Sequence, residues 1–546
     1  MLRQVFEGLG LVADRASMPG VGVGARSWFD VGVGLRRLVF GLLLAGLVVA
    51  AIWLARHGYS LVQVITALLI GLGVVLFLLQ SGRGKWTVAI ALLLVVPLFF
   101  RVGGTNPIDL PESSFNRLSG QTLPVGALLA VLIGMGLLLR GGLAALDRQR
   151  AVFWAIGVFL LSGLLLLVVG FIEHGRSVGP LFFVQLSVPL FAILPGLYAA
   201  DRPNGTRHVV ALVKWGLLLS CLAILIQTII HRGPAGLFGE PLLVRFGPLN
   251  IYQEADYVPF VFGIALLFVA ITEAHVRKIA WHDLVYVFIV GLIILGLYSR
   301  GAILTVAVGM TAAILLARRE YQARLARLAM VFLLVYVAGT VLGINGVQRI
   351  NATVVEIASS MKIASSAETS SSVETASAAN VQSILDSDRS LRHRYLGARQ
   401  ALAHLRYHPI SGSAFGRPTV PEELMQEPIF TGKRNSQYLG VTEFGSPHNQ
   451  YLDITLRGGL LWLTAFLALV FTATWRIWKT SRTTNSPVSA GVGLAVVCVL
   501  LSTALASNFY QHNFAQPFSG FFLWYLVGVG LAARDFPGSS DCRGRD

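Results

Sequence analysis

Charged side chains are scarce in this sequence: Asp, Glu, Lys and Arg together make up 13% of its 546 residues. Soluble globular domains carry about 25% charged residues and about 45–50% apolar ones. Here hydrophobic residues reach 55%, and the mean hydropathy is +0.69. This balance excludes an ordinary soluble protein and indicates an integral membrane protein.

Cysteine is also rare, with three residues in the whole chain. Cys221 and Cys498 fall inside long apolar runs and Cys542 lies near the C-terminus, so no disulfide framework is indicated. The spacings of His, Cys, Asp and Glu that hold a metal ion are missing as well. We therefore expect neither a metal nor any other cofactor.

A cleavable signal peptide is not evident, because the first apolar run starts only after residue 37 and is long enough to span a membrane. The Gly-rich stretch before it, PGVGVGARSWFDVGVGLRR, follows no strand pattern and so does not qualify as a phosphate loop. We interpret residues 1–37 as a flexible cytoplasmic lead and the first apolar run as an anchor.

What the chain does contain is a series of apolar windows of roughly 17–22 residues, the length that an α-helix needs to cross about 30 Å of hydrocarbon. The predicted fold class is an all-α polytopic membrane protein with about fourteen transmembrane helices. The predicted spans are 38–54, 60–80, 86–100, 123–139, 151–171, 180–199, 209–230, 258–274, 283–299, 301–317, 328–345, 457–474, 489–507 and 517–533.

Basic residues alternate between successive connections and predict the orientation, because Lys and Arg of short loops stay on the cytoplasmic side. With both termini inside, this topology and affinity for anionic lipid explain most of the formal net charge of +16, and no nucleic acid is implied. The cytoplasmic connections carry Arg36/Arg37, Arg83/Lys85, Arg148/Arg150, Arg202/Arg207, Arg277/Lys278, Arg318/Arg319/Arg324/Arg327 and Arg476/Lys479/Arg482.

With this topology the one long extramembrane segment is 346–456, on the non-cytoplasmic face. It separates a bundle of about eleven helices, 38–345, from about three C-terminal helices, 457–533, which a cytoplasmic tail, 534–546, follows. Its Ser/Ala/Thr-rich part, 356–387, is either disordered or a weakly amphipathic surface helix. We assign that part no catalytic role.

The stretch DRSLRHRYLGARQALAHLRYHPISGSAFGRP places apolar residues at helical spacing until Pro409 and Gly412 stop the pattern. We interpret it as an amphipathic helix lying against the membrane, with the apolar positions Leu391, Tyr395, Ala398, Leu402 and Leu405. Its other face suits a headgroup or pyrophosphate, or plain interfacial anchoring, and carries Arg389, Arg392, Arg394, Arg399 and Arg406.

A His-Asn pair, His448 and Asn449, stands shortly before the twelfth predicted span, in EFGSPHNQYLDITLRGGLLWL. A histidine at the outer mouth of a helix titrates near neutrality, and it can take a proton from a sugar hydroxyl if a neighbour fixes its tautomer. The alternative is an interfacial histidine at a helix end with no chemical role.

Arginines stand in two other outer connections. The loop 231–257 carries Arg245, with Glu254 and Asp256 further on, and Arg300 interrupts an apolar hairpin in GLYSRGAILT. An arginine inside a membrane costs about 2.5–3.5 kcal/mol on insertion scales, so Arg300 is either functional or snorkels to the interface. Arginines that converge from several loops would form a diphosphate pocket, because the guanidinium makes bidentate bonds to phosphate.

The segments RFGPLN, YSRGA, RYLGARQALAHLRYHPISGSAFG and PHNQYLDITLRGG, in this order, resemble the O-antigen ligase family and its relatives, the O-antigen polymerases and protein O-oligosaccharyltransferases. The similarity covers roughly residues 210–475. It implies transfer of a glycan from a polyprenyl diphosphate carrier to an acceptor, lipid A core for a ligase, at the periplasmic face of the inner membrane without a metal.

By the resemblance, Arg245, Arg300 and Arg394 bind the carrier diphosphate and His448 is the base. Asn449 would orient a sugar or cap the helix, and Glu254 and Asp256 are rival bases that neighbouring arginines weaken by lowering their pKa. Two extra spans and the Ser/Ala tract depart from the usual family pattern and leave ligase or polymerase open. Two further alternatives remain, a transporter or flippase of lipid-linked oligosaccharide and an inactive structural partner.

Overall fold

The structure is a computed structural model that describes residues 149–174, 181–201, 204–233, 236, 242, 257–297, 299–344, 398, 401–402, 404–416, 449–508, 514 and 517–533. Every regular element in these ranges is a helix and none is a strand, as the sequence predicts. The helices are α7 (Arg150–His174), α8 (Leu181–Ser187), η2 (Val188–Ala192), α9 (Ile193–Ala200), α10 (Gly205–Arg232), α11 (Tyr257–Val276), α12 (Trp281–Gly296), α13 (Arg300–Leu316), α14 (Arg319–Val341), α21 (Gln450–Thr483), α22 (Pro487–Ala506) and α23 (Pro517–Ala532).

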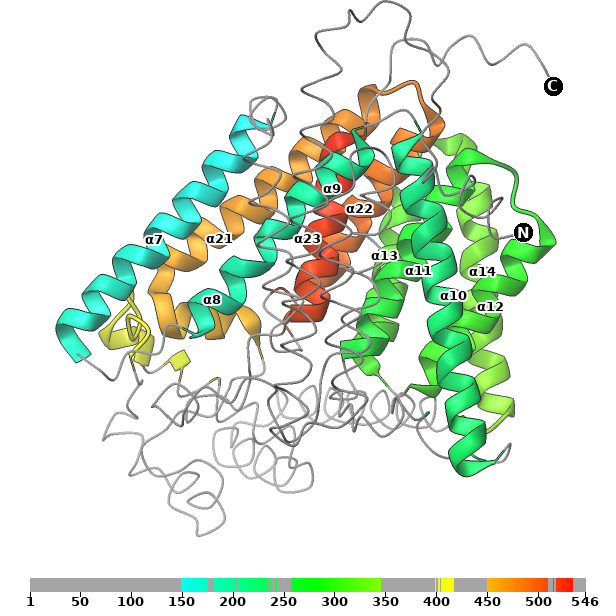
Figure 1. Ribbon diagram of the computed structural model, residues 1–546, viewed down its shortest axis with the longest axis horizontal. Helices are drawn as coiled ribbons and strands as arrows, with labels where there is room; N and C mark the ends of the chain where they lie inside the picture. The colour runs from blue at the N-terminus through cyan, green and yellow to red at the C-terminus, as the bar shows by residue number, and fades with distance from the viewer. Residues whose placement is uncertain are drawn as a thin grey trace, which may run out of the picture.

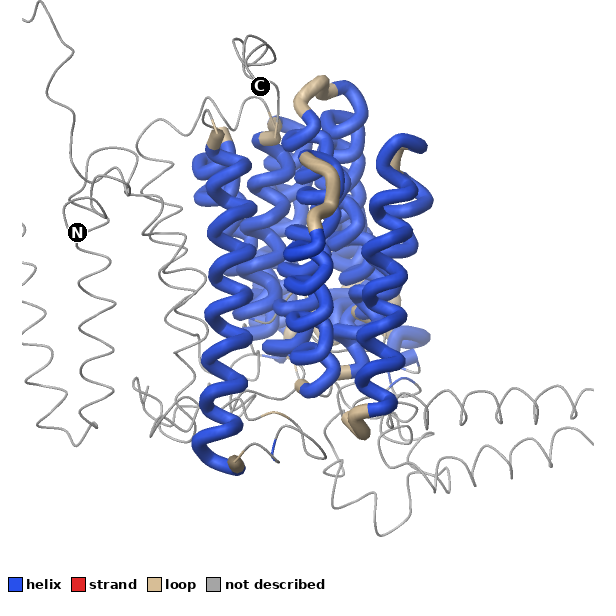
Figure 2. Tube along the Cα trace, turned by 90° about the vertical axis from the view of Figure 1, so that its right-hand side faces the viewer, coloured by secondary structure: helices blue, strands red, loops and turns tan. Residues whose placement is uncertain are grey.

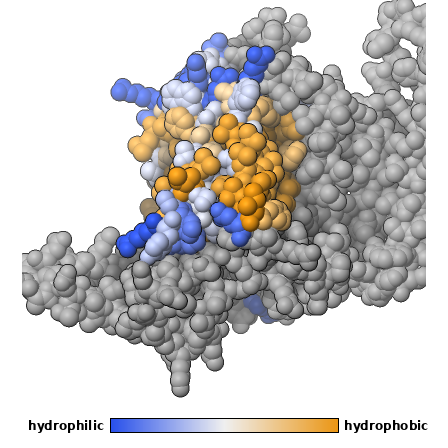
Figure 3. Space-filling model, turned by 90° about the vertical axis from the view of Figure 1, so that its left-hand side faces the viewer, coloured by the Kyte–Doolittle hydropathy of each residue, from blue (hydrophilic) through white to orange (hydrophobic). Residues whose placement is uncertain are grey.

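Seven helical stretches in the described ranges are long and apolar enough to cross a membrane, and shorter apolar helices accompany them. The helices run side by side along one direction (Figures 1 and 2). Figure 3 shows hydrophobic side chains as a belt across the middle of the described part, with hydrophilic residues at both ends. This distribution suits a bundle that stands upright in a bilayer. The predicted spans 38–54, 60–80, 86–100 and 123–139 lie outside the described residues.

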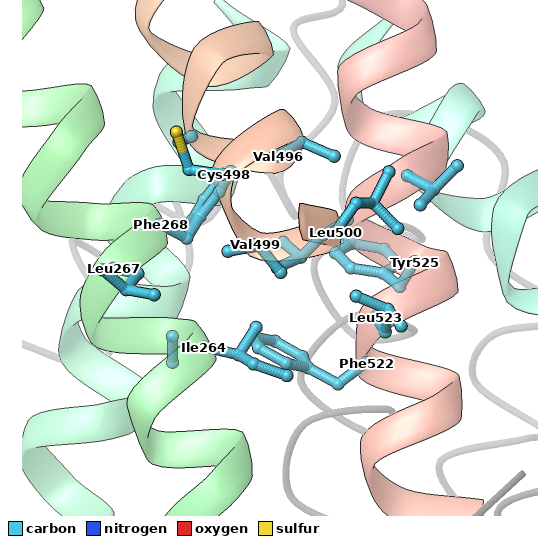
Figure 4. Close-up of a cluster of buried hydrophobic side chains, with 14 of the residues drawn as sticks. Ile264, Leu267, Phe268, Val496, Cys498, Val499, Leu500, Phe522, Leu523 and Tyr525 are labelled. Carbon is cyan, nitrogen blue, oxygen red and sulfur yellow. The ribbon is translucent and has the colours of Figure 1, made fainter. Parts of the chain in front are cut away.

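The centre of the bundle is α22, which packs against α11, α13, α21 and α23. A helix that is apolar all round belongs inside a bundle, and most residues of α22 are buried. In Figure 4, Leu267 and Phe268 of α11 lie on the side of Cys498 and Val499 of α22, while Leu500 lies on the side of Tyr525 of α23. This core holds in place the helices whose ends carry the predicted site residues.

Three predicted spans differ in their details. The span 328–345 corresponds to α14, which already begins at Arg319. The span 180–199 is divided into α8, η2 and α9, and the 3-10 turn carries Pro189 near its start, where the missing backbone N–H interrupts the α-helical ladder. The span 457–474 is part of a longer helix, α21, which already begins at Gln450 and continues to Thr483. The helix therefore starts directly after Asn449, the second residue of the His-Asn pair.

Charged side chains from several predicted cytoplasmic connections meet at one end of the bundle. Asp283 accepts hydrogen bonds from Lys214 at 3.1 Å and from Arg277 at 2.7 Å. Arg318 donates to the carbonyl of Arg482 at 3.0 Å, although the two residues are far apart in the sequence. We call this the basic end, and it agrees with the alternation on which the predicted orientation rests.

Candidate functional site

The opposite end of the bundle, at the bottom of Figure 1, gathers the segments that flank the predicted site residues. We call it the site end. The backbone nitrogen of Leu242 donates to the carbonyl of Gly296, the last residue of α12, at 2.9 Å. A Cβ built on Gly263, in the second turn of α11, would lie 3.2 Å from the carbonyl oxygen of Ala302, so the two helices approach closely there. The chain on both sides of 243–256 is therefore attached beside the start of α13.

Arg300 is the first residue of α13. Ser299 caps the helix, because its side chain accepts a hydrogen bond from the backbone nitrogen of Ala302 at 3.3 Å. The break expected in GLYSRGAILT is thus a real helix boundary, and it presents Arg300 at the positive end of a helix dipole. The positive end of the helix dipole favours an anion at this position.

The start of α21 is attached to the end of α22 at the same site end. Gln450 donates its backbone N–H to the carbonyl of Ser507 at 3.0 Å, and the Tyr451 hydroxyl donates to the carbonyl of Ala504 at 2.7 Å. α13 runs along α22 in the opposite direction, with Gly309 beside the Ser502 hydroxyl. The first residues of α13 and α21 consequently lie at one end of α22.

Asn449 caps α21. Its side-chain oxygen accepts hydrogen bonds from the backbone nitrogens of Tyr451 at 3.0 Å and Leu452 at 3.1 Å, and its own backbone is extended. The capping role expected for this residue is confirmed. Because its side chain bonds to the first turn, Asn449 fixes where α21 begins.

Past its second turn, α21 is kinked at Gly459, which has φ 65° and ψ −172°. The kink separates two pairs of backbone groups that a regular helix would join, the carbonyl of Leu456 with the nitrogen of Leu460 and the carbonyl of Arg457 with the nitrogen of Leu461. Such groups must find other partners when they are buried.

The turn that follows the predicted amphipathic helix supplies all four partners. Leu456 and Arg457 accept from the backbone nitrogens of Ser413 (2.8 Å) and Phe415 (3.0 Å), while Leu460 and Leu461 donate to the carbonyls of Pro409 (2.8 Å) and Ile410 (3.4 Å). We call residues 409–416 with these four bonds the clasp. The clasp attaches the segment 346–456 to the site end.

Within the amphipathic stretch, helix is described up to Tyr407 and ends before Pro409, as predicted. Gly412 has φ 56°, and a Cβ there would lie 2.6 Å from the carbonyls of Thr455 and Leu456. Leu402, on the predicted apolar face, is 55% exposed and available to lipid, while Ala401 and His404 are buried against the protein. The predicted contact of the apolar face with the membrane stays a prediction.

Arg457 is a residue of this region that the sequence analysis did not single out. Its guanidinium carbon lies 4.6 Å from the ring centroid of Phe182 in α8. Its Nε atom is buried without a hydrogen-bond partner. The available signal was an arginine directly before a Gly pair and a long apolar run.

A cavity of about 350 Å³ lies between α12, α13 and α14. It begins with Ile303, one turn from Arg300, and continues along α13 to Ile314, with Phe332 and Tyr336 on the side of α14. Ligand pockets measure roughly 300–1,000 Å³. The apolar lining suits a hydrocarbon chain.

Of the predicted site residues, Arg245, Glu254, Asp256, Arg394 and His448 lie outside the described residues. Their described neighbours are the segments brought together at the site end. In the described ranges, no group of three or more His, Cys, Asp or Glu side chains is placed to hold a metal ion.

Comparison with known proteins bears on the same region. No curated protein matches the chain. Residues 285–466 match the family described as O-antigen ligase. This match runs from α12 through α13, α14 and the clasp to the kinked first half of α21. Through this segment, about a third of the chain, the protein is similar to the O-antigen ligase family.

Proposed function

We propose that this protein transfers a glycan from a polyprenyl diphosphate carrier to an acceptor at the periplasmic face of a bacterial inner membrane. The observation that carries the proposal is the family match over 285–466, a segment that contains Arg300, Arg394 and His448. The gathering of the helix starts at the site end supports it, because a transferase needs its donor and acceptor groups at one place.

In the proposed reaction, Arg245, Arg300 and Arg394 bind the carrier diphosphate. His448 takes the proton of the acceptor hydroxyl as the hydroxyl oxygen attacks the anomeric carbon. The bond between that carbon and the diphosphate oxygen breaks, and polyprenyl diphosphate leaves with the electron pair. The arginines offset the negative charge that grows on the leaving group. Attack from the opposite side inverts the anomeric configuration, and the reaction needs no metal or cofactor.

Asn449 serves this reaction through the position of its neighbour, since its cap fixes the first turn of α21. Glu254 and Asp256 are the rival bases, and arginines beside them would weaken both by lowering their pKa. We propose that segment 346–456 forms the periplasmic cap of the site and that the termini are cytoplasmic. The apolar cavity beside Arg300 would take the first part of the polyprenyl chain.

The acceptor distinguishes two forms of the proposal. A ligase transfers the finished polymer to lipid A core, and a polymerase transfers one lipid-linked glycan to a second lipid-linked glycan. The donor chemistry and the roles of Arg300 and His448 are the same in both. We propose the ligase form.

The test is the glycan pool of cells whose only copy of the protein carries His448→Ala, with membrane levels measured by immunoblot. A ligase predicts that intact lipid-linked polymer accumulates and finished surface glycan is lost at a normal protein level. Accumulation of single lipid-linked repeat units would identify a polymerase, and lipid-linked glycan confined to the cytoplasmic leaflet would identify a flippase. Unchanged glycan output would reduce His448 to a helix-end residue and reject the mechanism.

A further inference from the structure

Arg457 lies inside α21, two residues before the kink, and no hydrogen bond or salt bridge joins its side chain to the described part of the chain. The ring of Phe182 faces its guanidinium at 4.6 Å. Its Nε is shut off from solvent, while part of the residue stays exposed. The aromatic face and the negative charge of Asp453, one turn earlier in α21, therefore act on this guanidinium, and its N–H groups form no hydrogen bond in that part of the chain.

Several other cationic side chains of the described helices have acceptors. At the basic end, Lys214 and Arg277 pair with Asp283, Arg324 donates to the carbonyl of Ala274, and Arg482 donates to the carbonyl of Leu316. Leaving the donors of a partly buried arginine unpaired is costly, so such an arrangement usually has a function. Arg457 differs from these residues in its lack of an acceptor and in its place near the site end.

Two further donors beside the kink also have no partner among the described residues. They are the hydroxyl of Ser413, in the clasp, and the indole N–H of Trp462, one turn beyond Gly459. Phe415 connects these regions, since its ring centroid lies 4.8 Å from that of Trp462 and its backbone nitrogen bonds to Arg457. The indole N–H of Trp462 lies against Gly163 of α7, inside the bundle. Buried polar groups are nearly always hydrogen-bonded, so the unpaired Nε of Arg457 and the hydroxyl of Ser413 point to a ligand with acceptor oxygens.

The expected depth of Arg457 in the membrane matches the depth at which anionic lipid headgroups lie. The run of apolar residues in α21 begins at Leu460, just past the Gly pair. The helix begins at Gln450, at the site end. Arg457 thus lies at the border between polar and apolar surroundings, where the phosphate groups of membrane lipids are found.

We propose that Arg457 is a further binding residue for the diphosphate of the polyprenyl carrier, an inference that rests on the proposed function. A guanidinium keeps its charge and binds phosphate oxygens in a bidentate manner, which a neutral sugar would not require. The clasp holds the backbone of Arg457 and Phe182 holds its side chain, so the residue is preorganised before the carrier arrives.

The experiment measures binding of undecaprenyl diphosphate, undecaprenyl phosphate and undecaprenol to the purified full-length protein in lipid nanodiscs. The variants are Arg457→Gln, Arg457→Lys and the matched control Arg482→Gln. Arg482 belongs to the same helix and also lies over an aromatic ring, with its guanidinium carbon 4.2 Å from the ring centroid of Trp478 at the basic end. Thermal unfolding of each variant shows whether the fold is retained.

We expect Arg457→Gln to bind the diphosphate roughly ten- to hundred-fold more weakly, as the loss of a charged hydrogen bond predicts, with binding of undecaprenol unchanged. The diphosphate affinity of Arg457→Lys should lie between those of Arg457→Gln and the unaltered protein. Arg482→Gln should bind the diphosphate as tightly as the unaltered protein. If Arg457→Gln does not fold, Arg457→Lys is used for the test instead. Its ratio of affinity for undecaprenyl diphosphate to affinity for undecaprenyl phosphate should be lower than that of the unaltered protein.

Equal diphosphate binding by Arg457→Gln and the unaltered protein would overturn this role for Arg457 and leave the proposed function intact. Equal loss of diphosphate and undecaprenol binding would also overturn it, because it would show that Arg457 only holds α8 against α21. If the unaltered protein does not bind undecaprenyl diphosphate, the proposed function fails and this inference fails with it.

Discussion

The backbone nitrogen of Phe415 donates a hydrogen bond to the carbonyl of Arg457 at 3.0 Å, across the kink in α21. This bond replaces the helical bond that Gly459 prevents, and it couples the segment after the amphipathic stretch to the helix that begins beside His448. The clasp therefore links two regions that the sequence separates by a long stretch of chain. Its geometry leads to the first prediction.

Gly459→Ala should destabilise the protein strongly. At φ 65° an alanine is strained, and its Cβ would collide with the carbonyl of Ile410. We expect a loss of about 2–4 kcal/mol in the free energy of unfolding, measured as a lower midpoint of thermal unfolding in detergent. The matched control is Gly216→Ala in α10, where a Cβ meets nothing within 4 Å. A Gly459→Ala variant as stable as the control would contradict the kink.

Asn449→Ala should lower the free energy of unfolding by about 1 kcal/mol, because the first turn of α21 loses its cap. Asn449→Ser keeps a capping oxygen and should unfold near the temperature of the unaltered protein. Transfer activity of the serine variant then separates the two roles. Retained activity assigns Asn449 to capping alone, while lost activity in a stable protein means that the amide also orients a sugar.

Arg300→Gln should abolish most glycan transfer without loss of the protein from the membrane. The variant removes the positive charge at the start of α13 and leaves the cap by Ser299 in place. The measurement is accumulation of lipid-linked glycan in cells. Arg318→Gln, at the basic end, is the control, since it removes the same charge far from the site end. Normal transfer by Arg300→Gln would make this arginine an interfacial anchor.

Ala307→Trp should raise the KM for a long-chain carrier, because the indole would fill the apolar cavity between α12, α13 and α14. Ala307 lines that cavity and is exposed, so the fold has room for the change. Leu315→Trp, on the same helix, is the control, since Leu315 is 74% exposed and does not line the cavity. Transfer from a carrier with a shortened chain should suffer less. Equal KM values in both variants would remove the cavity from the proposed substrate path.

Much of the architecture follows from local sequence. The apolar runs determine where the helices form, because a segment in lipid must satisfy its backbone hydrogen bonds internally. The ends at Asn449 and at Pro409 are equally local, since a capping side chain and a missing N–H act within one turn. These features were predictable from a few neighbouring residues.

Other features depend on contacts between segments that are distant in the sequence. Hydropathy treats 457–474 as one span, yet Gly459 kinks the helix there and residues 409–416 supply the missing partners. The burial of Ala401 and His404 in the amphipathic stretch likewise depends on packing against the rest of the bundle.

The sequence by itself determined the class of the protein, the positions of the described spans and the residues that resemble a transferase site. Only the tertiary structure decided that the starts of α11, α13 and α21 share one end of the bundle, and that Arg457 lies there without an acceptor among the described residues. The physical reason is the distance along the chain over which each effect acts. Helix formation is set by side chains within a few turns, whereas the pairing of helices depends on how whole faces fit together.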